Sequence, residues 1–155
     1  MNLVSQILPL SNVMLDVDVS SKKRIFEQAG LLFENNHQIS RALVFDKLFE
    51  REKLGSTGLG KGVAIPHGKI VGLKKAVAAM FRLRTPIAFE SPDRVGVKLV
   101  FVLLLPERAA VLHLSIMAQL AQMLRDESLR EALYNAPSAE ELHVLLSQWS
   151  SHVAD

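Results

Sequence analysis

The sequence has 155 residues, of which 49% are hydrophobic and 22% are charged; this predicts one globular domain over residues 1–155 rather than a disordered chain. Its 18 basic and 16 acidic side chains leave a net charge of +2, which argues against nucleic acid as a partner because nucleic-acid-binding domains are strongly basic. The absence of cysteine excludes disulfides, thiolate nucleophiles and cysteine-ligated metal sites.

The N-terminal residues lack the basic start and uninterrupted apolar core of a secretion signal. The longest apolar run, Leu99–Leu105, has the length of a strand and is far shorter than the roughly 18 residues that a membrane helix needs. We therefore expect a cytoplasmic protein that does not insert into a membrane.

Positive charge is concentrated in the middle of the chain. Residues 41–84 hold ten basic and three acidic side chains, a net +7, so the remainder of the chain carries +2 − 7 = −5. A local positive field of this kind attracts anions to whatever site lies there.

The first two predicted elements are helices capped by serine. Ser20 or Ser21 caps the first, which Asn35-Asn36 ends. Ser40 caps the second, and Gly55 ends it in a left-handed conformation. The buried stripe of the second helix is predicted to be Val44, Phe45, Leu48 and Phe49.

Strands are predicted in the middle of the chain. Residues 55–62 contain four glycines and are expected to be irregular. The short strand-like run Val63–Pro66 follows them and places His67 directly after its end. Residues 76–84 alternate, so one face should be buried (Val77, Ala79, Phe81, Leu83) while the other carries Arg82 and Arg84. Residues 96–105 are almost wholly apolar and predict a strand covered on both faces, closed by Pro106.

The last part of the chain predicts three helices. The first spans 109–125 with Leu112, His113, Ile116, Met117, Leu120 and Leu124 inside, the second covers 129–134, and the third follows a capping box of Ser138 and Glu141. The expected fold is α/β, a small mixed β-sheet sandwiched by helices on both faces.

The glycine-rich segment fits the phosphate-loop pattern G-x-x-x-x-G-K from Gly55 to Lys61. However, Gly62 replaces the Mg²⁺-binding Ser or Thr and a strand follows instead of a helix, so we reject an ATPase and expect no nucleotide cofactor. Two interpretations stay open: a flexible loop, or an anion site formed by backbone amides at Gly55, Ser56, Thr57, Gly58, Gly60 and Gly62.

Three side chains are candidates for chemistry. His67 lies between Pro66 and Gly68 directly after a short strand, which suits a nucleophile or a structural hydrogen bond at a turn. His113 is a buried structural residue, or it meets His67 if both strand ends lie at the same edge of the sheet. Arg51 either binds phosphate oxygens or serves the C-terminus of its helix.

The remaining histidines, His37, His143 and His152, have no metal-ligand spacing with other residues and are interpreted as surface or structural. We therefore expect no metal.

The run from Arg51 to Gly68, with its Ala-Ile-Pro-His-Gly end, resembles the phosphorylation-site signature of enzyme IIA proteins of the phosphotransferase system, mannitol/fructose class. Its Gly-Ser-Thr-Gly version is most similar to the nitrogen-regulatory branch. Residues 85–89, the strand from Val97 and the His113 helix follow in the order of the family, so the resemblance covers nearly the whole chain.

The resemblance implies a phosphocarrier with an α/β sandwich fold that accepts a phosphoryl group on His67, with His113 beside it and Arg51 supporting the phosphoryl group. It implies a small histidine phosphocarrier protein as donor and no turnover by the chain alone. Regulatory targets such as potassium transporters or sensor kinases would be bound according to phosphorylation state.

Three alternatives remain. A sugar-transport enzyme IIA would pass the phosphoryl group to a permease component, and a phosphorylation-independent binding module would recognise an acidic partner surface. A zinc hydrolase would use His67 and His113 with a carboxylate, but the sequence shows no third ligand.

Overall fold

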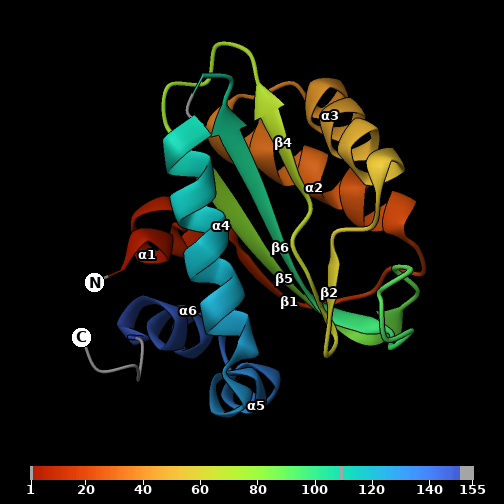
Figure 1. Cartoon of the computed structure of the whole chain (residues 1–155), viewed down its shortest axis with the longest axis vertical. Coiled ribbons are helices and arrows are strands. Elements are labelled where there is room, and N and C mark those ends of the chain that lie inside the picture. Colours follow the sequence, from red (N-terminus) through yellow and green to blue (C-terminus); the bar gives the residue numbers. More distant parts are fainter. Residues whose placement is uncertain (1, 109, 151–155) are drawn as a thin grey trace.

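A mixed six-stranded sheet forms the central layer of the protein (Figure 1). The computed structural model describes residues 2–108 and 110–150. The strands are β1 (Val13–Val17), β2 (Gly58–Gly60), β3 (Val63–Ala64), β4 (His67–Ile70), β5 (Val77–Ile87) and β6 (Val97–Pro106). The helices are α1 (Leu3–Ile7), the short 3-10 helix η1 (Leu10–Asn12), α2 (Lys22–His37), α3 (Arg41–Leu54), α4 (Ala110–Arg125), α5 (Glu127–Asn135) and α6 (Ala139–Gln148).

Strand β6 lies at the centre of the sheet and pairs with β3, β4 and β5. The strand order is β1-β5-β6-β3-β2, and β4 also pairs with β6. Strand β5 runs antiparallel to β6, whereas β3 and β4 run parallel to it. The expected mixture of strand directions is therefore confirmed, and so is a central strand that is covered on both faces.

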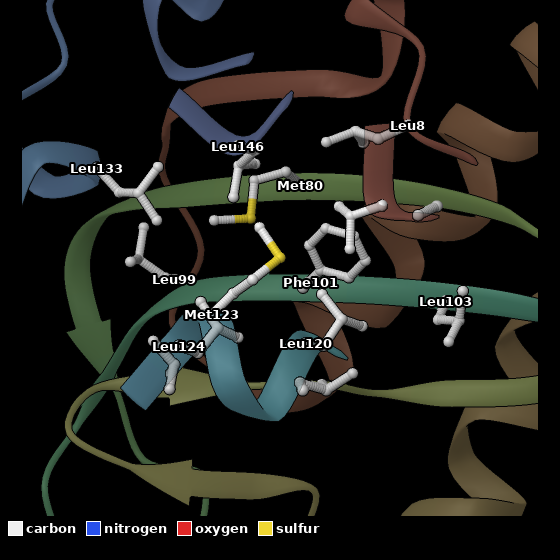
Figure 2. Packing of buried hydrophobic residues seen from close by; sticks show 14 of the residues in the cluster. Leu8, Met80, Leu99, Phe101, Leu103, Leu120, Met123, Leu124, Leu133 and Leu146 are labelled. Carbon is white, nitrogen blue, oxygen red and sulfur yellow. The ribbon is translucent and has the colours of Figure 1, made fainter. Parts of the chain in front are cut away.

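Helices cover both faces of the sheet, as the sequence predicts. Helices α2 and α3 pack on one face, and α1, α4, α5 and α6 pack on the other (Figure 1). Alternate residues of β6 enter the two cores: Phe101 and Leu103 belong to the same core as Leu120 and Met123 of α4 (Figure 2), and Val102 belongs to the core beneath α2 and α3. Each such fully buried side chain contributes about 1.5–3 kcal/mol of apolar burial.

Serine caps begin three helices at the predicted positions. The hydroxyls of Ser21, Ser40 and Ser138 accept hydrogen bonds from the first-turn amides of α2, α3 and α6. The predicted end of α2 is wrong, and so is the predicted conformation of Gly55, although Gly55 does end α3 as expected. Helix α2 continues past Asn35-Asn36, and Gln38 ends it with a φ of 56°. Gly55 ends α3 with a φ of 157° and a ψ of 149°, outside the left-handed helical region.

The glycine-rich segment is more regular than predicted. Gly58–Gly60 forms β2, which pairs antiparallel with β3 in a hairpin. Gly58 is buried against Ser91, so closely that a β-carbon would collide with the Ser91 hydroxyl. Glycine in this strand therefore allows close approach of the backbone rather than irregular structure.

Burial along β5 and α4 also departs from the expectation. Both faces of β5 are buried, because Ala78 and Met80 pack in the core opposite to that of Val77. Arg82 is half-buried and donates hydrogen bonds to the carbonyl oxygens of Leu133 and Ala136 at the end of α5, at 2.9 and 2.7 Å. Leu112 of α4, expected inside, is exposed.

Gly62, at the hairpin turn, has a φ of 83°, and a β-carbon there would lie 2.5 Å from the Tyr134 hydroxyl. We expect Gly62→Ala to lower the free energy of unfolding by about 2–3 kcal/mol, since it adds this collision to backbone strain of about 1 kcal/mol. Gly72→Ala is the matched control, because Gly72 has a φ of 87° but open space around it. Urea unfolding measures both, and equal losses would contradict the role assigned to the Tyr134 contact.

Candidate functional site

His67 is the first residue of β4, on the strand path that runs beside β6. Val63 of β3 is opposite Leu99, and His67 is opposite Leu103, both in parallel register with β6. Between them, the Pro66 carbonyl accepts a hydrogen bond from the Leu103 amide at 2.9 Å. From the sequence we expect His67 to follow the end of a strand. In the structure the chain instead continues along the sheet at His67 as strand β4.

A backbone carbonyl fixes the protonation of the His67 ring. Nδ1 lies 2.9 Å from the carbonyl oxygen of Ile65. Because a carbonyl can only accept, Nδ1 carries the proton and donates it, and the neutral ring keeps its lone pair on Nε2. The side chain is half-buried, and Nε2 is the ring atom that holds a lone pair able to accept a proton or another electrophilic group.

His113 lies in the first turn of α4, and its ring is beside that of His67. The two ring centroids are 5.4 Å apart and the rings are inclined at 66°. Strand β6 and α4 bring the second imidazole to this place, since the strand ends at Pro106 and the helix begins at Ala110. The structure therefore confirms that the two imidazoles meet.

Arg51 lies in the last turn of α3. Its Nη1 donates a 2.8 Å hydrogen bond to the carbonyl oxygen of Gly55, so the guanidinium caps the C-terminal end of its own helix. The same charge also acts on both imidazoles. The two interpretations of Arg51 are thus compatible, because one contact with Gly55 leaves further N–H groups of the five-donor fork for an anion.

Burial favours the neutral form of both imidazoles. The pKa of His67 is lowered first by burial, and the charges of Arg51 and His113 lower it further, against opposing effects of the Ile65 carbonyl and Glu52. Burial also lowers the pKa of His113, together with the charges of Lys69 and Arg51. Both rings therefore favour the unprotonated form, in which a lone pair is available.

The glycine-rich segment divides into two parts. Gly55, Ser56 and Thr57 connect α3 to β2 beside Arg51, whereas the hairpin turn with Gly60 and Gly62 lies at the level of Leu99. Leu99 is four residues from Leu103 along β6, roughly 13 Å from the level of His67. The structure therefore does not bring Gly60 and Gly62 to the imidazoles.

Several amides of this segment are already hydrogen-bonded within the protein. The amides of Thr57, Gly58 and Lys61 donate to the side chains of Glu52, Ser56 and Asp93. The Ser56 hydroxyl in turn donates to the Phe89 carbonyl oxygen. Of the six amides predicted to form an anion site, those of Thr57 and Gly58 are thus engaged by side chains of the protein itself, and an anion site formed by these amides stays a prediction.

Glu52, a buried carboxylate one residue after Arg51, is not among the candidate residues predicted from the sequence. Its oxygens accept hydrogen bonds from the Thr57 amide at 3.0 Å and from the Thr57 hydroxyl at 2.6 Å. A signal was present in the sequence, since Val44, Leu48 and Glu52 follow one another at intervals of four and share the buried face of α3.

The other histidines have structural contacts. His37 contacts the Asn12 side chain at 2.8 Å, and Nε2 of His143 donates to the Leu8 carbonyl oxygen at 2.7 Å. His152 lies outside the described residues. Within residues 2–108 and 110–150, no three His, Asp or Glu side chains are grouped as a metal site requires. No helix in the described part of the chain has the length and apolarity to cross a membrane.

Comparison with known proteins gives a consistent family. Residues 6–149 match the family model "Phosphoenolpyruvate-dependent sugar phosphotransferase system, EIIA 2". The chain is 39% identical over 144 residues to a "Nitrogen regulatory protein" of Pseudomonas aeruginosa, covering 92% of this chain and 94% of that protein.

Solved structures extend the similarity to the fold. The crystal structure of nitrogen regulatory protein IIA-Ntr from Neisseria meningitidis superimposes with a TM-score of 0.89 at 51% identity, covering 94% of this chain and 99% of that one. IIA mannitol from Escherichia coli gives a TM-score of 0.74 at 25% identity, covering 89% and 97%. The chain therefore belongs to the EIIA 2 family of the phosphoenolpyruvate-dependent sugar phosphotransferase system.

Proposed function

We propose that the protein is a phosphohistidine carrier in which Nε2 of His67 accepts a phosphoryl group from a small histidine phosphocarrier protein. The observation that carries the proposal is the hydrogen bond from Nδ1 of His67 to Ile65, which leaves the Nε2 lone pair beside His113 and within the field of Arg51. We also propose that the phosphorylation state of His67 controls the binding of regulatory targets.

The transfer needs no proton acceptor. The Nε2 lone pair forms a bond to phosphorus, the bond between phosphorus and the donor imidazole breaks, and its electron pair stays on the donor nitrogen. His67 keeps its Nδ1 proton, so its ring becomes positively charged as the bond forms. The Ile65 carbonyl, which accepts that proton in a hydrogen bond, is placed to stabilise the charge.

Arg51 and His113 stabilise the transferred group. The Arg51 guanidinium attracts the equatorial phosphoryl oxygens, on which most of the transition-state charge is spread. His113 lies close enough to orient the phosphoryl group or the His67 ring. Positioning and electrostatic stabilisation of this kind supply most of the catalysis in phosphoryl transfer.

Exposed apolar side chains on the elements of the site support a protein as the donor. Leu54 ends α3, Val71 follows β4, and Val111 and Leu114 flank His113 on α4, and all four are exposed. Together with the net positive charge of residues 41–84, they offer a partner both apolar contact and attraction for acidic groups.

The regulatory branch is supported by the greater identity to IIA-Ntr, 51% against 25% for IIA mannitol. A phosphoryl group brings nearly two negative charges to a positive surface, which can reverse the partners that the surface accepts. Potassium transporters and sensor kinases are the target classes that we propose. The sugar-transport alternative requires transfer onward to a permease component, and that transfer distinguishes the two.

Replacing the acceptor tests the phosphocarrier directly. With phosphorylated donor, the wild type should gain acid-labile phosphate, and His67→Ala should gain none because it lacks Nε2. His113→Ala should be phosphorylated about 10- to 100-fold more slowly, since positioning is lost. His143→Ala, which removes a ring bonded to Leu8, is the control and should behave as wild type. Phosphate on His67→Ala would show that the acceptor is another residue.

The lowered pKa values predict the pH dependence. NMR titration should place the midpoints of His67 and His113 below the ordinary value of about 6.5, because burial opposes protonation. The unfolded chain, with the ordinary pKa of about 6.5, then binds protons at a higher pH than the folded chain. The stability that these rings contribute is therefore present above about pH 6.5 and is lost as pH falls from there through the lower pKa values of the folded protein. Midpoints at or above 6.5 would contradict the buried, neutral state.

Partner binding tests the regulatory role. Pull-downs with unphosphorylated and phosphorylated protein should capture different partners, since the modification changes the surface charge. His67→Asp, which adds a permanent negative charge, should shift binding toward the phosphorylated pattern. Identical partners in all three samples would favour the phosphorylation-independent binding module, and transfer to a permease component would favour the sugar-transport branch.

A further inference from the structure

We propose that Glu52 is a positioning residue for His67 and acts through Thr57 and Ile65. The inference deepens the proposed function and rests on it where phosphoryl transfer is concerned. The tautomer that it assigns to His67 can be measured without any transfer.

The Glu52 carboxylate is buried and fully engaged. Its side chain is 4% exposed. One oxygen accepts from the Thr57 hydroxyl at 2.6 Å, and the other accepts from the Thr57 amide at 3.0 Å and from Lys22 Nζ at 2.9 Å. A buried carboxylate is costly unless paired and hydrogen-bonded, and here three donors from two other segments converge on it.

Thr57 passes this constraint to the strand that holds His67. The Thr57 carbonyl oxygen accepts a hydrogen bond from the Ile65 amide at 3.0 Å. The Ile65 carbonyl oxygen accepts the Nδ1 proton of His67 at 2.9 Å. The position of the Ile65 carbonyl, and with it the His67 ring, therefore depends on a residue that Glu52 holds at both its amide and its hydroxyl.

The connection matters because Ile65 lies where the strand is interrupted. Strand β3 ends at Ala64, and β4 begins at His67. The Ile65 carbonyl is therefore held through its neighbours: the Ile65 amide donates to the Thr57 carbonyl oxygen on one side, and the Pro66 carbonyl accepts from the Leu103 amide on the other. If Thr57 shifts, the carbonyl loses its alignment with Nδ1 and the proton is free to occupy Nε2, the atom that must attack.

The charge of Glu52 also acts at the site. Glu52 and Arg51 are neighbours in α3 with opposite effects on His67: the carboxylate raises the pKa of the imidazole, and the guanidinium lowers it. Lys22 compensates the carboxylate on its other side and also contacts exposed Glu90 at 3.2 Å. Glu90 thus shares the lysine partner but has no contact with Thr57 among the hydrogen bonds of the described residues.

The test measures the His67 tautomer and the transfer rate together. In long-range ¹H–¹⁵N NMR spectra, wild type should show the proton on Nδ1. Glu52→Gln and Thr57→Val should populate the Nε2–H tautomer and slow phosphoryl transfer by on the order of 10- to 100-fold. Thr57→Ser keeps the hydroxyl and should therefore retain the wild-type tautomer and the wild-type transfer rate. Glu90→Gln is the matched control and should leave the tautomer and the transfer rate unchanged. Thermal melting shows whether each variant is folded.

Folded Glu52→Gln and Thr57→Val proteins with wild-type tautomer and rate would overturn the inference. Thr57→Val removes one hydroxyl and nearly conserves volume, so it keeps the test decisive if Glu52→Gln does not fold. A tautomer shift in a protein whose wild type accepts no phosphoryl group would support positioning by Glu52 while refuting the carrier function. Loss of transfer with an unchanged tautomer would assign Glu52 a role other than positioning.

Discussion

The hydrogen bond from Nδ1 of His67 to the Ile65 carbonyl oxygen decides what the site can do. An imidazole that is free to choose its tautomer presents a lone pair on either nitrogen, whereas this one presents it on Nε2. The same carbonyl can stabilise positive charge on the ring, so in the phosphoryl transfer that we propose one contact would both select the attacking atom and favour the product. The precision of the site therefore depends on how well residue 65 is held.

Electrostatics at the candidate site favour unprotonated imidazoles. Burial and Arg51 lower the pKa of both His67 and His113, and Lys69 lowers that of His113. A phosphoryl group on His67, as we propose, would instead be attracted by the same cations, because it is negatively charged. The charges that disfavour protonation of the rings would thus also stabilise the proposed phosphorylated state.

Much of the fold, and the nearness of His67 to His113 at the candidate site, could be predicted from local signals. The serine caps, the apolar run of β6 and the position of His113 soon after that strand are all readable along the chain. The hairpin could not be predicted, because Gly58 belongs to a strand only through its close packing against Ser91. The spacing of Glu52 from Val44 and Leu48 indicates its burial, but its pairing could not be predicted, because its partner Lys22 lies on another helix.

The pairing register of β6 explains why the run from Arg51 to Gly68, which is contiguous in sequence, occupies two separate places in the structure. Val63 is fixed at Leu99 and His67 at Leu103, so the turn that precedes β3 must lie well away from the imidazole. The glycines at that turn form the hairpin of β2 and β3, and Gly62 leaves room for the Tyr134 hydroxyl. The residues before β2 instead return toward α3, where Glu52 holds Thr57 and Thr57 holds Ile65. Nearness in sequence to His67 is therefore a poor guide to influence on it, and Glu52, 15 positions earlier in the sequence, is better connected to the ring than Gly62.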